Sequence, residues 1–199
     1  DLCLREGIGR FYVSHLVYSG RGVGFSRNDL APVDARAMME RLFDRACDLL
    51  DDPRPMRIVT GGNDSDGVAL LLYVLRRYGP RAASRVQSLL ERRGGNSAGE
   101  KVINIDHRGD VHPDQFWRTL NMGNVMQTPL QEILEGETAQ KLRNRTAYLT
   151  GKCGICPAVA LCRGSHRERA EVAFGDMWAE DPACVLDQKD FEALAAGRR

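Results

Sequence analysis

The amino-acid sequence predicts an α/β fold in its first half and a smaller α+β region in its second half. Strand-like and helix-like segments alternate as far as residue 93, which is typical of a parallel sheet covered by helices. From residue 94 onward, short strand-like runs surround glycine turns, and four of the six cysteines lie in the last quarter of the chain. We therefore expect two units, residues 1–93 and residues 94–199.

The first predicted strand and helix occupy residues 10–50. Residues 10–18 are rich in β-branched and aromatic side chains and end at a glycine loop, so they predict a strand. Apolar side chains alternate to both faces, as in a parallel strand that is covered on both sides. Apolar residues at helical spacing then predict an amphipathic helix over 33–50, with Pro32 in its first turn.

A second strand and two further helices complete the first unit. Residues 56–60 predict a short strand that ends at Gly61-Gly62, and Asp64 or Ser65 caps a helix that stops at Gly79-Pro80. Another helix is expected over residues 81–92. Two strands leave both edges of a parallel sheet open, so further strands outside this chain or a partner must cover them.

The second unit is predicted to contain less regular structure. A hairpin is expected from strands at 102–105 and 111–112, with a further turn at 122–124. Short helices are expected over 129–134 and 138–145, and a terminal helix over 191–196. Residues from 151 up to that last helix are expected to be mainly loop.

The overall composition indicates a folded protein without a membrane span or a nucleic-acid partner. Of the 199 residues, 43% are hydrophobic and 28% are charged, which supports a packed core. No apolar run reaches the roughly 18 residues of a transmembrane helix. The net charge of +1 argues against nucleic-acid binding through bulk positive charge. Without a signal peptide or an even spread of cysteines, we expect a cytoplasmic protein with reduced thiols.

The cysteines of the last quarter predict a metal centre. Cys153, Cys156 and Cys162 form a Cys-x2-Cys-x5-Cys pattern, and Cys184 can return from 21 residues downstream. Four thiolates suit either a tetrahedral zinc ion or an iron–sulfur cluster. A single Cys-x2-Cys turn followed by solitary cysteines favours the cluster, because structural zinc sites usually pair two such turns. His166 could replace Cys184 as fourth ligand, although its arginine-rich surroundings favour a solvated side chain.

Several segments together resemble a known enzyme family. The chain is similar to the C-terminal part of radical SAM enzymes that carry SPASM/Twitch domains, and within these to the enzymes of haem d1 and alternative haem biosynthesis. The resemblance covers nearly the whole chain. It is carried by residues 11–21, 60–67, 94–99, 104–106, 111–117, 120–125, 151–156, Cys162 and 178–184.

The resemblance implies a fold and a set of cofactors. Residues 1–93 would be the last strands and helices of a partial (β/α)6 radical SAM barrel, and residues 94–199 a SPASM/Twitch-like iron–sulfur domain. The family's Cys-x3-Cys-x2-Cys triad is absent, so this chain looks like the C-terminal half of a longer enzyme. Asp114 and His166 stand where many relatives have cysteine, which leaves ligands for one auxiliary 4Fe-4S cluster.

The implied reaction is the removal of side chains from an iron tetrapyrrole. The complete enzyme would use S-adenosylmethionine and a second 4Fe-4S cluster held by the missing N-terminal half, with electrons from a reductant protein. The catalytic residues are not identified by the resemblance. Two alternatives remain open: a related enzyme that modifies a peptide, and a non-catalytic zinc- or cluster-binding module.

Four residues are candidates for binding S-adenosylmethionine or substrate. His15 lies near the end of the first predicted strand and Arg21 in the loop after it, and Asn63 and Asp64 follow the second strand, where ligands commonly bind in α/β proteins. A packed core histidine explains His15 as well, and an ordinary turn explains the glycine pair before Asn63. Only four of the 28 basic residues are Lys, and arginines such as Arg163, Arg167 and Arg169 could pair with substrate carboxylates.

Overall fold

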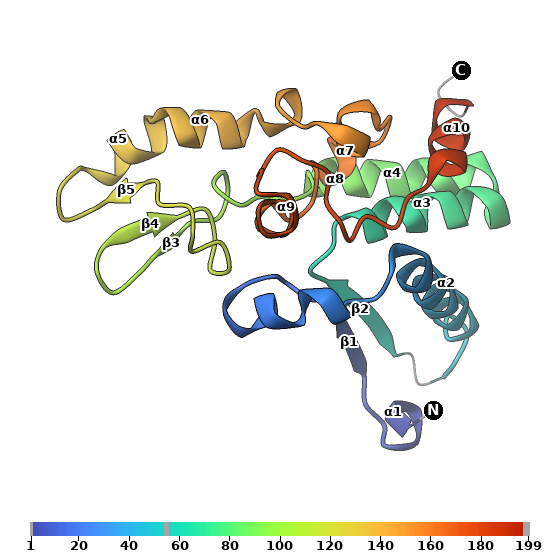
Figure 1. The fold of residues 1–199 in the computed structure, drawn as a ribbon. Coiled ribbons are helices and arrows are strands. Elements are labelled where there is room, and N and C mark those ends of the chain that lie inside the picture. The colour runs from blue at the N-terminus through green and yellow to red at the C-terminus, as the bar shows by residue number, and fades with distance from the viewer. Residues whose placement is uncertain (1, 54–55, 197–199) are drawn as a thin grey trace.

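A computed structural model describes residues 2–53 and 56–196, which form a mixed α/β structure with two small sheets (Figure 1). The elements before residue 94 are α1 (Leu2–Arg5), β1 (Arg10–Ser14), the 3-10 helix η1 (Gly20–Asn28), α2 (Pro32–Asp48), β2 (Arg57–Gly61), α3 (Ser65–Tyr78) and α4 (Pro80–Arg93). The elements after it are β3 (Asn104–Ile105), β4 (Asp110–His112), β5 (Gly123–Asn124), α5 (Leu130–Glu135), α6 (Glu137–Arg143), the 3-10 turn η2 (Arg145–Ala147), α7 (Gly151–Ile155), α8 (Val159–Cys162), α9 (Arg167–Phe174) and α10 (Gln188–Ala196).

The first sheet consists of β1 and β2, which pair in parallel over their whole length, from Arg10 opposite Arg57 to Ser14 opposite Gly61. The predicted strand over 10–18 is too long, because the chain turns into η1 soon after Ser14. The expectation that both faces of this strand are covered is also wrong. Tyr12 is 60% exposed, since the described residues pack against only one face of this two-stranded sheet.

Helices α3 and α4 follow the predicted boundaries closely. Gly79 ends α3 at φ 79°, a conformation that side chains with a Cβ disfavour, and Pro80 begins α4 where its missing N–H is not needed. In Figure 1 these two helices run side by side, with α10 against them and α2 beside the sheet. No helix of the described part of the chain is both long enough and apolar enough to span a membrane.

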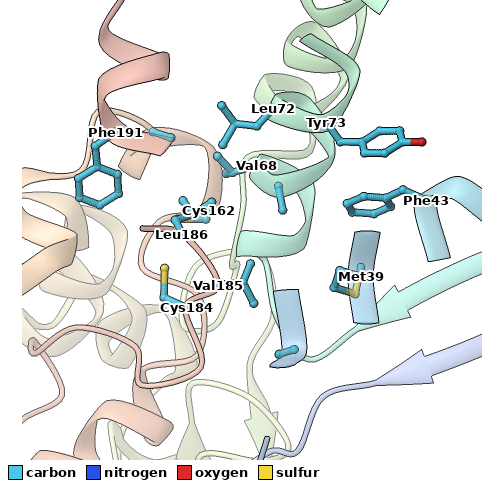
Figure 2. Packing of buried hydrophobic residues seen from close by; sticks show 13 residues of the cluster. Met39, Phe43, Val68, Leu72, Tyr73, Cys162, Cys184, Val185, Leu186 and Phe191 are labelled. Atoms are coloured by element: carbon cyan, nitrogen blue, oxygen red, sulfur yellow. The ribbon is translucent and has the colours of Figure 1, made fainter. Parts of the chain in front are cut away.

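One buried cluster joins the two halves of the chain. Met39 and Phe43 of α2 and Val68 and Leu72 of α3 pack in the same cluster as Leu186 and other residues of the last quarter (Figure 2). Two cysteines of the predicted metal centre belong to this cluster. The division at residue 93 remains a prediction, and the core extends across it.

The second half departs from the sequence prediction in two places. Residues 122–124 were expected to form only a turn, but β5 pairs with β4 and extends the β3–β4 hairpin to three antiparallel strands. Residues from 151 were expected to be mainly loop, but they form α7, α8 and α9. Helix α9 has no apolar stripe that periodicity could detect, because three of its four buried residues are charged: Arg167, Glu168 and Arg169, beside Ala170.

Candidate metal centre

Short elements carry the four cysteines of the last quarter, and three of them, Cys156, Cys162 and Cys184, lie in or against the buried cluster. Cys153 lies within α7, Cys156 directly follows that helix, and Cys162 ends α8. Cys184 lies in the loop that precedes α10, and Figure 2 shows it close to Cys162 and Leu186. All six cysteines of the chain are free thiols. The arrangement therefore supplies four thiols from three segments.

Three of the four thiols, those of Cys153, Cys162 and Cys184, are buried, and Cys156 is half-buried. Burial raises the pKa of Cys162, and the charges of Cys184, Cys153 and Cys156 raise it further. Burial likewise raises the pKa of Cys184 to about 12, although a backbone hydrogen bond from Leu186 and the charge of Lys152 oppose the shift. Thiols of this kind stay protonated at neutral pH unless a cation replaces the protons, which is what a bound metal centre does.

The four thiols are a donor set that fits an iron–sulfur cluster. Among the described residues, one group of three potential ligands has all its ligand atoms within 4.8 Å of one another, and it contains no cysteine. Four sulfurs at about 2.3 Å from one tetrahedral zinc ion would lie about 3.8 Å apart. The cysteine sulfurs are therefore not gathered at the spacing of one zinc ion.

A buried ion pair holds the loop that carries Cys184. Arg169 of α9 donates to both carboxylate oxygens of Asp181, at 2.9 and 2.6 Å, and both side chains are essentially inaccessible to solvent. One oxygen of Asp181 also accepts the backbone N–H of Ala183 at 3.0 Å, and the backbone N–H of Cys184 donates to the carbonyl of Asp181. This geometry fixes the backbone on the N-terminal side of Cys184.

The same arginine connects the cysteine loop to the carboxyl end of the first sheet. Arg169 Nη1 donates to the carbonyls of Leu16 and Gly62, which follow β1 and β2. Asn63 donates from its side-chain amide to the carbonyl of Ala183 at 2.8 Å. The turn after β2 and the loop before Cys184 are thus one hydrogen-bonded unit.

Cys162 is positioned by a close backbone approach. Gly95 has a φ of +64°, and a Cβ at this position would lie 2.7 Å from the carbonyl carbon of Cys162. The backbone N–H of Asn96 donates to the carbonyl of Cys162 at 3.3 Å. The fully buried Arg145 donates hydrogen bonds to the side-chain oxygen of Asn96, at 2.9 Å, and to the carbonyl of Ala98.

The residues proposed to bind S-adenosylmethionine or substrate have different surroundings. His15 Nε2 lies 3.0 Å from the carboxylate of Asp66 on α3. Asn63 is buried, and its amide is engaged with Ala183. Arg21 is exposed in η1, and Asp64 lines a cavity and pairs with Arg93 at 3.5 Å. Arg21 is therefore the one residue of this set with an exposed side chain, whereas 11% of the Asp64 side chain is exposed.

Two interpretations of the arginine-rich run are wrong. Arg167 and Arg169 are fully buried and bind backbone carbonyls and Asp181, so they are not free to meet substrate carboxylates. His166 is not a solvated side chain, since only 11% of it is exposed, and it lies beside Glu168 and Asp114. The structural importance of Arg145 and Asp181 has no signal in a single sequence, because their partners are distant along the chain.

Comparisons with known proteins find relatives over nearly the whole chain. Residues 97–157 match the SPASM family, described as an iron–sulfur cluster-binding domain. The pre-heme d1 synthase of Dinoroseobacter shibae is 42% identical over 93% of this chain and 46% of its own length. The Fe-coproporphyrin III synthase of Methanosarcina barkeri is 35% identical over 96% of this chain and 49% of its own length. An AdoMet-dependent heme synthase of the same organism is 44% identical over 93% of this chain and 50% of its own length.

The relatives are about twice as long as this chain. The chain spans about half the length of the curated relatives it matches. No solved structure matches it. The resemblance seen in the sequence is confirmed: residues 97–157 match the SPASM iron–sulfur domain, and nearly the whole chain is similar to about half the length of enzymes named pre-heme d1 synthase, Fe-coproporphyrin III synthase and AdoMet-dependent heme synthase.

Proposed function

We propose that this chain is the C-terminal half of a radical SAM enzyme that removes side chains from an iron tetrapyrrole in haem d1 or alternative haem biosynthesis. The observation that carries the proposal is the convergence of four thiols within a chain whose relatives are named for haem-type products. Cys153, Cys156, Cys162 and Cys184 are the proposed ligands of one auxiliary 4Fe-4S cluster. When bound, such a cluster supplies one-electron chemistry, with a potential set by burial and hydrogen bonding.

Residues 1–93 are proposed to be the last strands and helices of a partial (β/α)6 barrel. The parallel β1–β2 pair supports this, since parallel strands joined through a helix are the repeating unit of such barrels. The missing N-terminal half would supply the other strands, the Cys-x3-Cys-x2-Cys triad with its cluster, and most contacts to S-adenosylmethionine. A reductant protein would deliver the electron.

The candidate binding residues all follow the carboxyl ends of β1 and β2. His15 and Arg21 follow β1, and Asn63 and Asp64 follow β2. Ligands of parallel α/β folds commonly bind at this edge. Arg21 is the proposed partner of a substrate carboxylate, because a guanidinium can bind both carboxylate oxygens at once and this one is exposed. His15 and Asn63 would act mainly by fixing the shape of that edge.

Anaerobic reconstitution tests the cluster. The full chain should bind about four iron atoms with matching sulfide and show the broad visible absorption of an iron–sulfur cluster. Cys184→Ser should lose most of this iron, whereas Cys47→Ser, outside the proposed ligand set, should retain it. A colourless chain that holds one zinc ion would instead support the zinc-module alternative.

The activity is tested with the complete enzyme. A longer protein with the triad upstream of this chain should cleave S-adenosylmethionine when reduced and convert an iron tetrapyrrole that carries propionate or acetate side chains. Arg21→Gln should raise KM for the tetrapyrrole, while Arg27→Gln, exposed in the same 3-10 helix, should leave it unchanged. Turnover of a peptide but not of a tetrapyrrole would favour the peptide-modifying alternative.

A further inference from the structure

A second group of potential metal ligands lies outside the cysteine site. Asp114, His166 and Glu168 have ligand atoms that all lie within 4.8 Å of one another, and no other group in the described ranges 2–53 and 56–196 meets this condition. Asp114 follows β4, whereas His166 and Glu168 lie at the start of α9. The three side chains therefore come from two segments that are distant along the chain.

The group faces a cavity. Asp114 and His166 line a cavity of about 480 Å³, together with Asp64, Asn96 and Phe116. Glu168 is almost completely buried beside His166, with 3% of its side chain exposed. An ion could reach His166 and Asp114 from the cavity, and ligand positions on that side would remain open.

Glu168 has a carboxylate oxygen without a hydrogen-bond partner. Its Oε1 is buried and accepts no hydrogen bond. His166 Nδ1 makes a long hydrogen bond of 3.4 Å with Oε2 and lies 3.3 Å from Oε1. A charge-assisted N–H···O bond is usually about 2.7–2.9 Å long. Two ligands at about 2.1 Å from one tetrahedral metal ion lie about 3.4 Å apart, so this separation also allows both groups to bind one ion.

Asp114 is held in place with one oxygen left for another partner. Its Oδ1 accepts the backbone N–H groups of Phe116 and Trp117, both at 2.8 Å. These bonds fix the carboxylate at the wall of the cavity. A buried carboxylate oxygen without a donor is unfavourable, and a cation between Asp114 and Glu168 removes that cost.

We propose that Asp114, His166 and Glu168 bind one divalent first-row transition-metal ion, such as Mn²⁺, Fe²⁺ or Zn²⁺. Two carboxylates and one imidazole are a hard-to-intermediate donor set, which suits these ions and not an all-thiolate cluster. The proposal rests on this geometry alone and is independent of the proposed function. The ion would sit at the wall of the cavity with at least one open position toward it.

Mn²⁺ binding to the full chain, with its cysteines already loaded with iron and sulfide, tests the site. Mn²⁺ is the probe because it prefers oxygen and nitrogen ligands to thiolates. Loss of the electron paramagnetic resonance signal of free Mn²⁺ should reveal one bound ion per chain, and Zn²⁺ should displace it. Glu168→Gln and His166→Gln should each weaken Mn²⁺ binding at least about tenfold.

Matched variants and a second readout keep the result interpretable. Glu192→Gln and His107→Gln replace exposed residues of the same types and should bind Mn²⁺ as the parent chain does. Iron content and near-ultraviolet circular dichroism report whether each variant folds and loads its cysteines. The proposal is overturned if the folded parent chain binds no Mn²⁺ at millimolar concentration, or if a folded His166→Gln chain binds it equally well. Neither result bears on the cysteine site, which the iron content reports.

Discussion

The β1–β2 layer and the cysteine-bearing region differ in how completely their arginine side chains are covered. In the first, Arg10 and Arg57 are exposed at the start of the two strands, and the Tyr12 ring is 60% exposed. In the second, Arg145, Arg167 and Arg169 are fully buried and every one of them binds backbone carbonyls. The contrast indicates that the first region is built to receive further structure, whereas the second is built to hold short, irregular segments in one arrangement.

Removing the metal centre should produce the largest effect and should sharpen this contrast. Residues 151–187 form only short helices and loops around the four cysteines, so the free energy of metal binding becomes folding free energy there. After anaerobic chelation of iron, amide hydrogen exchange in this segment should accelerate at least about a hundredfold. Exchange in the middle of α3 should change much less, because Val68 and Leu72 keep their contacts with α2. Equal acceleration in both segments would show that the two regions do not differ in this way.

Breaking the Arg169–Asp181 pair should have the next largest effect. Leaving one buried charge without its partner costs about 3–5 kcal/mol, so Arg169→Met and Asp181→Ala should each lower the free energy of unfolding by this amount. The double variant Arg169→Met with Asp181→Leu should recover part of the loss, since it buries no unpaired charge. Chemical denaturation of the metal-loaded chains measures these values, and Arg45→Met serves as an exposed control. Additive losses in the double variant would contradict the pairing.

The same pair predicts a pH dependence. Burial by itself would raise the pKa of Asp181, but the charge and hydrogen bonds of Arg169 outweigh it, and the pKa lies below the ordinary 3.8. A carboxyl with a lowered pKa stabilises the fold above its unfolded value, and this contribution is lost as pH falls through the lowered value. The stability difference between the parent chain and Asp181→Asn should therefore be constant above about pH 5 and shrink below about pH 4. Glu192→Gln should show no such trend, and iron content should be recorded at each pH.

Substitutions at two glycines, one in each region, should have the smallest effects on stability. Gly95→Ala introduces a Cβ against the backbone of Cys162 at a positive φ, so it should cost about 1–3 kcal/mol and reduce iron retention. Gly61→Ala places a Cβ against the Tyr12 side chain, which is exposed and can rotate away. Its cost should stay within about 1 kcal/mol. Thermal unfolding and iron content of the two variants measure the difference, and similar losses in both would mean that the sheet region is as tightly packed as the cysteine region.

The parts of the fold that the sequence predicted well are those defined by local patterns. Apolar spacing and the Gly79-Pro80 boundary located α3 and α4 to within a residue or two. The glycine turn at 106–110 located the β3–β4 hairpin. Such features depend on contacts between residues that are close in sequence, and these are visible in one chain.

The parts that the sequence did not predict depend on buried charged residues that form hydrogen bonds and ion pairs with other segments. Helix α9 was not predicted because three of its four buried residues are Arg167, Glu168 and Arg169. A search for apolar periodicity treats such charged residues as exposed. The arginines were therefore misread as groups available to a substrate. Burial of a guanidinium is tolerated only when carbonyls or a carboxylate accept its N–H groups, and most of those partners come from segments outside α9.

The sequence by itself indicated the kind of group that the protein can bind, because the type and spacing of the cysteines favour a thiolate-bound metal centre. Only the tertiary structure decided how the Cys184 loop is held against Arg169 and Asn63, and that His166 lies with Asp114 and Glu168. The physical reason is distance along the chain. Asn63 and Ala183 are 120 residues apart and share one hydrogen bond, and a contact of that kind exists only once the whole chain has folded.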